Sequence, residues 1–379
     1  MLTPRERVLT ALKHEEPDRV PLGLGASGAS VTDDVYFKLK DYFGIEGDVE
    51  PFRSGHGDNI YDPRVFDCLG VDFRHVFLRS SLDFKPPVNE DGSLVNEWGV
   101  AVKKYGRFYE WVSHPLAEAD LSDLDNYKWP KPYTGQRQRG LQDTVQEYYQ
   151  KSDFAIASRS PSRGFFDLGI QLRGFERFMT DMVLDKKFTH KFMGKLLETI
   201  IGFYDVLLEQ AGPYIHIVET QDDYGHQNSL FFSPALFREM IKPYRAELNA
   251  FIKKKAPQAS IFIHTCGAVS ELIEDLIDCG VDVVNPVQPL AKGMETKKLK
   301  ERFGGKIVFH GGIDLQKALA GSKEDVEIEV KTRLRDLAPG GGYILSPANV
   351  VQDDVPVENI VLLFDLARKY GQYPIDIPE

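Results

Sequence analysis

Residues 261–267 read IFIHTCG, a short apolar run that leads directly into a histidine and a cysteine. A run of this length, followed by polar residues and a glycine, is typical of a buried parallel strand that ends at a loop. In an extended segment residues i and i+2 point the same way, so His264 and Cys266 face the same space. Imidazole and thiolate are preferred zinc ligands, and a catalytic zinc leaves one position open. The stretch predicts either a metal-binding strand end or a buried histidine beside a core cysteine.

The same pattern recurs along the second half of the chain. Apolar runs lie at 154–157, 215–218, 261–263, 281–284, 307–309 and 343–345, and the amphipathic segments near them cover 185–211, 234–255, 268–279, 323–337 and 356–370. Strands that alternate with helices indicate βαβ units and a parallel sheet. The number of units and the 379-residue length favour an α/β fold of the (β/α)8 TIM-barrel type. No linker divides the chain, so residues 1–379 are expected to form one domain.

The first third of the chain shows other patterns. Thr3, Pro4 and Glu6 predict a helix start with a capping box, and residues 33–43 form a second amphipathic segment. We interpret both as an N-terminal extension of the barrel. Residues 83–113 combine a turn signal at 89–92 with alternating aromatic and β-branched residues. This segment predicts an inserted β-hairpin or small antiparallel sheet.

The bulk composition limits the partners. The formal net charge of −11 argues against nucleic acid or an anionic membrane surface as the main partner. The chain has 3 cysteines, too few for a disulfide framework. The N-terminus lacks the apolar region of a signal peptide, and we find no apolar stretch of about 18 residues. We therefore expect a cytoplasmic protein that binds neither nucleic acid nor membranes.

Polar residues follow the apolar runs, where a barrel gathers its chemistry. A carboxylate at such a strand end suits a general acid or base, or binds a substrate hydroxyl. Adjacent side chains alternate in direction, so only one of Asp222 and Asp223 is expected to face the site. His310 either lines the pocket or hydrogen-bonds within its loop. The residues that share this position are Glu219, Asp223, Tyr224, Gln227, Asn285, His310 and Asn349.

An ordered series of motifs carries a family resemblance. The chain resembles the uroporphyrinogen decarboxylase superfamily of (β/α)8 barrels, which includes cobalamin-dependent methyltransferases such as the methylcobamide:coenzyme M enzymes. The resemblance runs nearly end to end. It rests on RERVLTALKHEEPDRVPL (5–22), DGS…EWG (91–99), SHPL (113–116), DDYGHQ (222–227), SPALF (233–237), HTCG (264–267), HGGID (310–314) and GGYILSPANVVQDDVPVENI (341–360).

The decarboxylase branch matches less well. Those enzymes carry an arginine-rich stretch after the first strand that binds the carboxylates of the substrate. Here the corresponding residues 23–31 read GLGASGASV, without an arginine. The decarboxylases also have a histidine at the position of Asn349. With the net charge of −11, these differences disfavour decarboxylation of a porphyrinogen.

The methyltransferase branch matches better at HTCG. In that branch the His-X-Cys pair binds zinc, and a second cysteine near the chain end completes the site. His264 and Cys266 match the pair, but Asn349 stands at the second cysteine, and Asn285 stands near the position of a glutamate in distant methionine synthases. Amide oxygens are weak zinc ligands. Three possibilities remain: completion of the zinc site by another side chain, an altered ligand set suited to an oxygen substrate, or loss of the metal. The candidates for completion are Glu219, Asp223 and His310.

The resemblance implies a methyltransferase that moves a methyl group between a small O- or N-methylated substrate and a corrinoid (cobalamin) cofactor, carried by a partner corrinoid protein. The resemblance implies that His264 and Cys266 are zinc ligands. It implies catalytic roles for Asp223, Glu219 and His310, with Asp223 or Glu219 as proton donor or third ligand. The implied substrate-binding residues are Tyr224, Gln227, Asn285 and Asn349. Two alternatives remain: a metal-free decarboxylase acting on a small acid, and a non-catalytic protein that binds a small molecule or a corrinoid.

Overall fold

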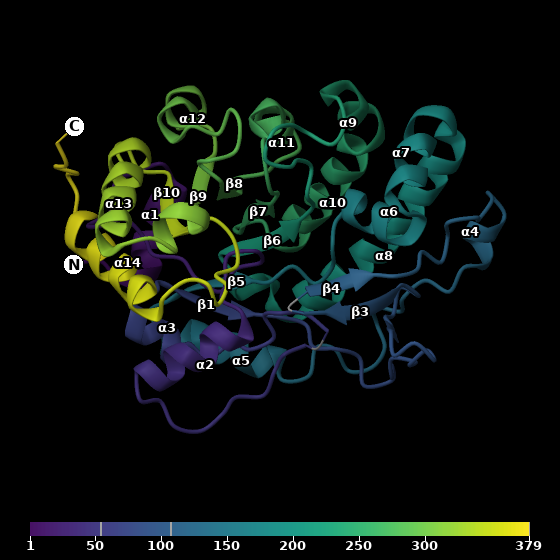
Figure 1. Cartoon of the computed structure of the whole chain (residues 1–379), viewed down its shortest axis with the longest axis horizontal. Helices are drawn as coiled ribbons and strands as arrows, with labels where there is room; N and C mark the ends of the chain where they lie inside the picture. The colour runs from purple at the N-terminus through teal and green to yellow at the C-terminus, as the bar shows by residue number, and fades with distance from the viewer. Residues whose placement is uncertain (54, 107, 379) are drawn as a thin grey trace.

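A curled parallel sheet forms the centre of the protein (Figure 1). The computed structural model describes residues 1–53, 55–106 and 108–378. The sheet has 7 strands, hydrogen-bonded in the order β1 (Phe73–Val76), β5 (Ala155–Ser158), β6 (Ile217–Gln221), β7 (Ser260–His264), β8 (Val283–Val287), β9 (Val308–Ile313) and β10 (Tyr343–Pro347). The order follows the chain, as expected where each strand passes through a helical crossover to its parallel neighbour.

The sheet does not close by its strand ladder alone, which ends at β1 on one side and β10 on the other. Residues 20–24 run between these two edges. Leu22 forms a parallel bridge with Leu345 of β10, and its carbonyl accepts a hydrogen bond of 2.9 Å from the N–H of Asp72, next to β1. The fold is therefore TIM-barrel-like, and the prediction of a closed (β/α)8 barrel is confirmed only in part. An irregular segment with a single bridge takes the place of a further ladder strand.

Charged pairs fix this irregular segment. The carboxylate of Asp72 accepts hydrogen bonds from Arg7 (2.7 Å), Arg19 (2.8 Å) and the N–H of Leu22 (2.7 Å). Asp72 and Arg7 are buried. Buried charges persist where they are paired and hydrogen-bonded, as they are here. The N-terminal extension is thus tied to the strand edge that it covers.

Helices surround the sheet, and both chain termini lie on the same side of the molecule, next to α13 and α14 (Figure 1). The α-helices are α1 (Pro4–Leu12), α2 (Asp33–Tyr42), α3 (Pro63–Leu69), α4 (Asp123–Asn126), α5 (Leu141–Lys151), α6 (Phe165–Arg173), α7 (Phe175–Leu184), α8 (Lys186–Ala211), α9 (Pro234–Met240), α10 (Lys242–Lys255), α11 (Ile273–Asp278), α12 (Thr296–Phe303), α13 (Lys323–Leu337) and α14 (Val357–Tyr370). In the described part of the chain, no helix combines the length and the apolar character needed to cross a membrane.

Most predicted helices are present, with one correction. The capping box before α1 forms: Thr3 accepts from the N–H of Glu6, whose carboxylate accepts in turn from the N–H of Thr3. The segment 234–255 was expected to be one helix, but it breaks at Ile241 into α9 and α10. Pro243 explains the break, because proline suits the first turn of a helix but clashes with the preceding turn in its interior.

The inserted segment forms a separate antiparallel sheet of 3 strands, β2 (Leu94–Val95), β3 (Ala101–Tyr105) and β4 (Phe108–Trp111). Strand β3 pairs with both of its neighbours in this sheet, for example at Val102, which lies opposite Leu94 on one side and Trp111 on the other. The prediction of a small antiparallel insertion within 83–113 is confirmed. The insertion lies between β1 and β5 in the chain and leaves their parallel pairing intact.

Candidate functional site

Three side chains of different chemistry meet at the carboxyl ends of β6 and β7. Asp223, His264 and Cys266 offer a carboxylate oxygen, an imidazole nitrogen and a sulfur that all lie within 4.8 Å of one another. His264 Nε2 lies 3.3 Å from Cys266 Sγ and 3.7 Å from Asp223 Oδ1. Nitrogen, sulfur and oxygen donors in one group of three match the ligand set of a catalytic zinc, which keeps one position open. The residues therefore fit a metal ion of this type.

A buried amide orients His264. Asn285, fully buried in the middle of β8, has its Oδ1 2.7 Å from His264 Nδ1 and its Nδ2 2.8 Å from His310 Nδ1. An amide oxygen accepts and an amide nitrogen donates, so this arrangement puts a proton on Nδ1 of His264 and leaves its Nε2 free to bind a cation. Asn285 was predicted to bind substrate. The structure instead places it behind the site, between two imidazoles.

The Cys266 thiol lies in an environment that resists ionisation in the absence of a cation. Burial, and after it the carboxylates of Asp223 and Asp167, raise the pKa of the thiol well above its ordinary value. The Asn349 amide reaches the sulfur at 3.5 Å and has the opposite, smaller effect. A metal ion that binds here has to displace the thiol proton. Asn349 thus contacts the candidate ligand Cys266.

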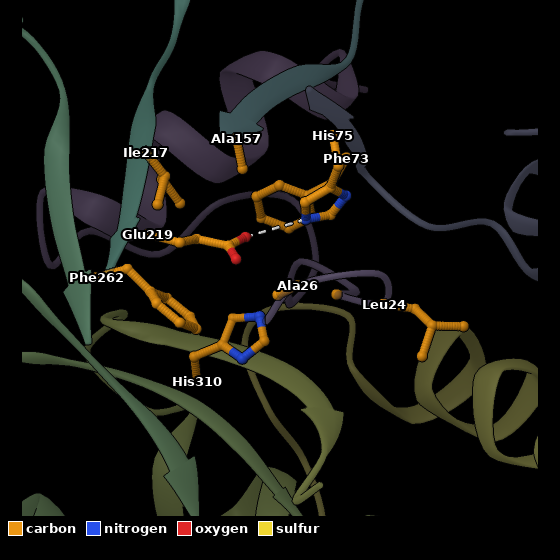
Figure 2. A pocket seen from close by; sticks show the side chains of 10 residues that line it. Leu24, Ala26, Phe73, His75, Ala157, Ile217, Glu219, Phe262 and His310 are labelled. Atoms are coloured by element: carbon orange, nitrogen blue, oxygen red, sulfur yellow. Dashed lines mark ion pairs between the residues drawn. The ribbon is translucent and has the colours of Figure 1, made fainter. Parts of the chain in front are cut away.

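Glu219 and His310 belong to a second, deeper cluster. Figure 2 shows both side chains and His75 pointing into one small cavity of about 10 Å³, enough for a single water molecule. Glu219 Oε1 lies 3.3 Å from His75 Nε2, and Glu219 Oε2 accepts a hydrogen bond of 2.7 Å from the N–H of Ser27. Among the described residues, His75 Nδ1 is buried without a partner. Glu219 is committed to these contacts and does not join the cluster of Asp223, His264 and Cys266.

His310 is held in its neutral form. Burial, followed by the neighbouring His75 and His264, lowers the pKa of His310 to about 3. Its Nδ1 faces the Asn285 amide, which also contacts His264. The deep cluster and the metal-type cluster are therefore separate but joined through one amide. This places His310 as an indirect neighbour of the candidate ligands.

The loop that lacks arginines packs directly on these histidines. A Cβ atom built on Gly23 would lie 2.6 Å from His310 Nε2, and one on Gly28 would lie 2.5 Å from His264 Nε2. Gly28 also has a φ of +65°, which favours glycine. The sequence GLGASGASV thus lets the backbone approach two imidazoles closely. The imidazole rings of His264 and His310 occupy the space that side chains at positions 28 and 23 would need.

An open cavity of about 190 Å³ lies beside this cluster. Gln227, Asn349 and Gln288 are among the residues that line it. Gln288 Oε1 accepts a hydrogen bond of 2.7 Å from the N–H of Gly267, next to Cys266, and the Asn349 amide contacts the Cys266 sulfur. The cavity is small for a ligand site, which suits a small substrate. Of the predicted substrate-binding residues, Gln227 and Asn349 lie on this cavity.

Asp222 and Asp223 do point in opposite directions. Asp222 is fully buried and accepts hydrogen bonds from the first N–H groups of α6, including that of Phe166 at 2.9 Å. It also pairs with Arg245 at 3.2 Å and with the hydroxyl of Tyr224 at 3.0 Å. The side chain of Tyr224 is consequently buried behind the rim, and the structure does not bring it to the cavity as the substrate-binding prediction expected.

Several functional candidates were missing from the sequence-based set. His75 lies inside β1, a strand that the sequence does not mark with an apolar run. Arg159 directly follows β5, so the rule applied to the other strand ends also identifies it. Arg53 and Asp58 lie on a loop, and Asp58 accepts hydrogen bonds from both arginines. A loop residue of this kind gives no local sequence signal.

Comparisons with known proteins agree with this architecture. The family model described as uroporphyrinogen decarboxylase (URO-D) matches residues 112–370. Uroporphyrinogen decarboxylase from Mannheimia succiniciproducens is 22% identical over 205 residues, which are 54% of this chain and 54% of that protein. The protein of the same name from Legionella pneumophila (strain Lens) is 21% identical over 197 residues, 52% of each chain. The chain thus spans about half the length of the curated relatives it matches.

The solved structure of a methyltransferase from Methanosarcina mazei superposes with a TM-score of 0.65 at 20% identity. The match covers 98% of this chain and 99% of the other. At this identity the similarity shows a shared fold. The family model covers well over half of the 379 residues, so the chain belongs to the uroporphyrinogen decarboxylase family.

Proposed function

We propose that the protein is a methyltransferase that moves a methyl group between a small O- or N-methylated substrate and a corrinoid, with zinc bound by Asp223, His264 and Cys266. The observation that carries the proposal is this group of nitrogen, sulfur and oxygen donors beside an open cavity. The sulfur, nitrogen and carboxylate set suits zinc better than magnesium or calcium, which prefer oxygen ligands throughout. The name of the structural neighbour, a methyltransferase, agrees with the proposal.

The chain's own residues would prepare the site in distinct ways. Asn285 holds His264 so that Nε2 faces the ligand position, and the N–H of Cys266 donates to Asp223 Oδ1 at 2.8 Å, which fixes that carboxylate. Zinc, when bound, supplies a Lewis acid that stabilises the departing oxygen or nitrogen of a methyl donor. Gln227 and Asn349 would contact the donor in the cavity. The corrinoid, carried on a separate protein, would approach from the side of the cavity that Gln227 and Asn349 line.

The first experiment is the zinc content of protein purified without chelator. We expect about one zinc per chain for a single three-ligand site. The Cys266→Ala variant should lose most of it, and Cys68→Ala, which removes an exposed cysteine elsewhere, should retain it. If neither the wild type nor the Cys68→Ala variant takes up zinc after metal is added, the zinc mechanism is wrong.

The second experiment tests methyl transfer itself. Methylation of a Co(I) corrinoid by O- and N-methylated donors is followed by the corrinoid's absorbance spectrum, for wild type and Cys266→Ala. We expect at least one donor to methylate the corrinoid with wild type and far more slowly with the variant. A zinc-loaded wild type that is inactive with every donor, alone and with corrinoid proteins, contradicts the methyltransferase assignment.

A metal-free decarboxylase is the second candidate. It is favoured by the curated relatives, which are named uroporphyrinogen decarboxylase. In that case Glu219 and His75, paired in the deep cavity, would transfer protons through the one water that this cavity can hold. Release of carbon dioxide from small acids by zinc-free protein distinguishes this candidate, because the methyltransferase requires the zinc that Cys266 would bind.

A further inference from the structure

Two arginines pair with one carboxylate near the end of β5, and a third arginine, Arg163, lies four residues after Arg159 in the chain. Arg53 and Arg159 both donate hydrogen bonds to Asp58, which is nine-tenths buried, and the Arg159 bond to Oδ2 is 2.7 Å long. The Ser30 hydroxyl donates to the same carboxylate at 2.8 Å. Burial, followed by the nearby charges of Arg159 and Arg163, lowers the pKa of Arg53 to about 10, although Asp58 opposes the shift. We call Arg53, Arg159 and Arg163 the arginine cluster.

The three arginines of the cluster contact two carboxylates, Asp58 and Asp167, so positive charges outnumber these partners by one. Asp58 is the carboxylate that pairs with both Arg53 and Arg159, and the charge of these arginines holds the pKa of Asp58 far below its ordinary value despite burial. A guanidinium offers five N–H donors. Within the described ranges, the hydrogen bonds that Arg159 donates from its side chain go only to Asp58 Oδ2. A buried arginine with so few partners is equipped to bind a further oxyanion.

Packing against an aromatic ring fixes the positions of two guanidinium groups in the cluster. The ring of Phe52 lies 5.0 Å from the guanidinium carbons of both Arg53 and Arg159. Phe52 is buried and packs on Phe77 with ring centroids 4.3 Å apart. Contacts of this kind hold a planar guanidinium in one orientation, which prepares it for bidentate binding of a carboxylate or phosphate.

The arginine cluster adjoins the candidate metal ligands. Arg159 follows β5, and Asp223 follows β6. Because these two strands are parallel neighbours, both residues lie at the carboxyl end of the sheet. Arg163 Nη1 lies 3.7 Å from Asp167 Oδ2, and the charge of Asp167 in turn acts on Cys266. Loop 23–31 connects both regions: Ser30 contacts Asp58 and Gly28 packs on His264. The two groups of residues therefore lie at the carboxyl end of the same sheet and share one supporting loop.

We propose that the arginine cluster binds an oxyanion, a carboxylate or a phosphate, on the methyl donor and so orients its methyl group toward Asp223, His264 and Cys266. This inference rests on the proposed function for the identity of the bound molecule. The subsite itself rests on the arginine geometry alone. It differs from the arginine stretch of the decarboxylases, since residues 23–31 of this chain hold no arginine. On a protein with a net charge of −11, the cluster is a local group of positive charges that favours an anion.

Isothermal titration with inorganic phosphate and with benzoate, each as a separate probe, tests the subsite. We expect one saturable site per chain for at least one probe, weakened on the order of tenfold to a hundredfold in Arg53→Gln and in Arg163→Gln, because hydrogen bonds to charged groups have this magnitude. These arginines have side chains 25% and 37% exposed, so the variants should fold. The probe with the higher affinity shows whether the site prefers a phosphate or a carboxylate.

Two controls make the result decisive. Arg163→Lys keeps the charge and should bind the probe more tightly than Arg163→Gln. Arg302→Gln removes an exposed arginine on α12 and should bind as wild type does. The inference is overturned if neither probe binds saturably, or if both Gln variants in the cluster bind as wild type does. Anion binding by a protein that takes up no zinc supports the subsite and contradicts only the zinc mechanism of the proposed function.

Discussion

Replacing Gly28 by alanine tests how the glycine loop supports the candidate metal ligand. Alanine at this position pays two separate costs. The φ of +65° is unfavourable for a residue with a Cβ by about 1–2 kcal/mol. The new Cβ would also lie 2.5 Å from His264 Nε2 and closer still to two other atoms of the ring. Ordinary contacts are about 3.5–4.0 Å, so ring and backbone have to separate by roughly 1 Å or more.

His264 cannot make this movement and keep its contacts. Its Nδ1 is held by Asn285 at 2.7 Å, and Cys266 Sγ lies 3.3 Å from Nε2. A metal site tolerates errors of only about 0.2 Å in ligand distance. We therefore expect Gly28→Ala to weaken zinc binding by at least the roughly 10- to 100-fold that changes behind a ligand produce. Competition with a chromophoric chelator measures this affinity.

Gly44→Ala is the matched control. Gly44 has a φ of +63°, almost that of Gly28, but a Cβ there meets nothing within 4 Å. Both variants should lose about 1–2 kcal/mol of unfolding free energy through the backbone, and overpacking should cost Gly28→Ala about 1–3 kcal/mol more. Equal zinc affinities in the two variants would refute the argument that the glycine keeps space for the His264 ring.

Three further predictions follow from buried polar groups. Asn285→Leu should lower zinc affinity roughly 10- to 100-fold in the same competition assay, because His264 loses the partner that fixes its tautomer. Burial lowers the pKa of His216 from 6.5 to about 4 in the folded protein, so the unfolded chain binds the proton more readily. The free energy of unfolding should fall by up to about 3 kcal/mol as the pH drops from 6.5 to 4. His216→Gln should make this pH dependence shallower in urea unfolding. An unchanged pH dependence in the variant would show that His216 is not its source. Asp222→Asn leaves Arg245 buried without its counter-charge and should cost about 3–5 kcal/mol in thermal or urea unfolding, whereas a loss below about 1 kcal/mol would show that the pair is dispensable.

The positions of the ladder strands after β1 were predictable because they depend on local pattern. The run before His264 is apolar and short, and β7 ends at that histidine as expected. Strand β1 was missed because its four residues, Phe73–Val76, include Arg74 and His75. Both polar side chains are buried only because tertiary partners receive them, and no single segment encodes those partners.

The site was predictable where it depends on one strand and not where it depends on register. His264 and Cys266 share a strand end, so their alternation was sufficient. Asn285 lies opposite His264 in the register between β7 and β8, which a sequence alone does not fix. Glu219 was expected just after its strand, but β6 continues to Gln221, so Glu219 points into the barrel interior beside His75.

The irregular segment between β10 and β1 bears on how the chain acquires its shape. Leu22 needs Leu345, more than three hundred positions later, before its bridge can form. A nascent chain that has not yet reached β10 already contains Asp223, His264 and Cys266 on neighbouring strands, but β9 still lacks its second neighbour and presents an open edge. Such edges pair readily with other chains. Residues 343–347 cover the edge of β9 when they pair with it, so we expect their arrival to reduce association of the growing chain.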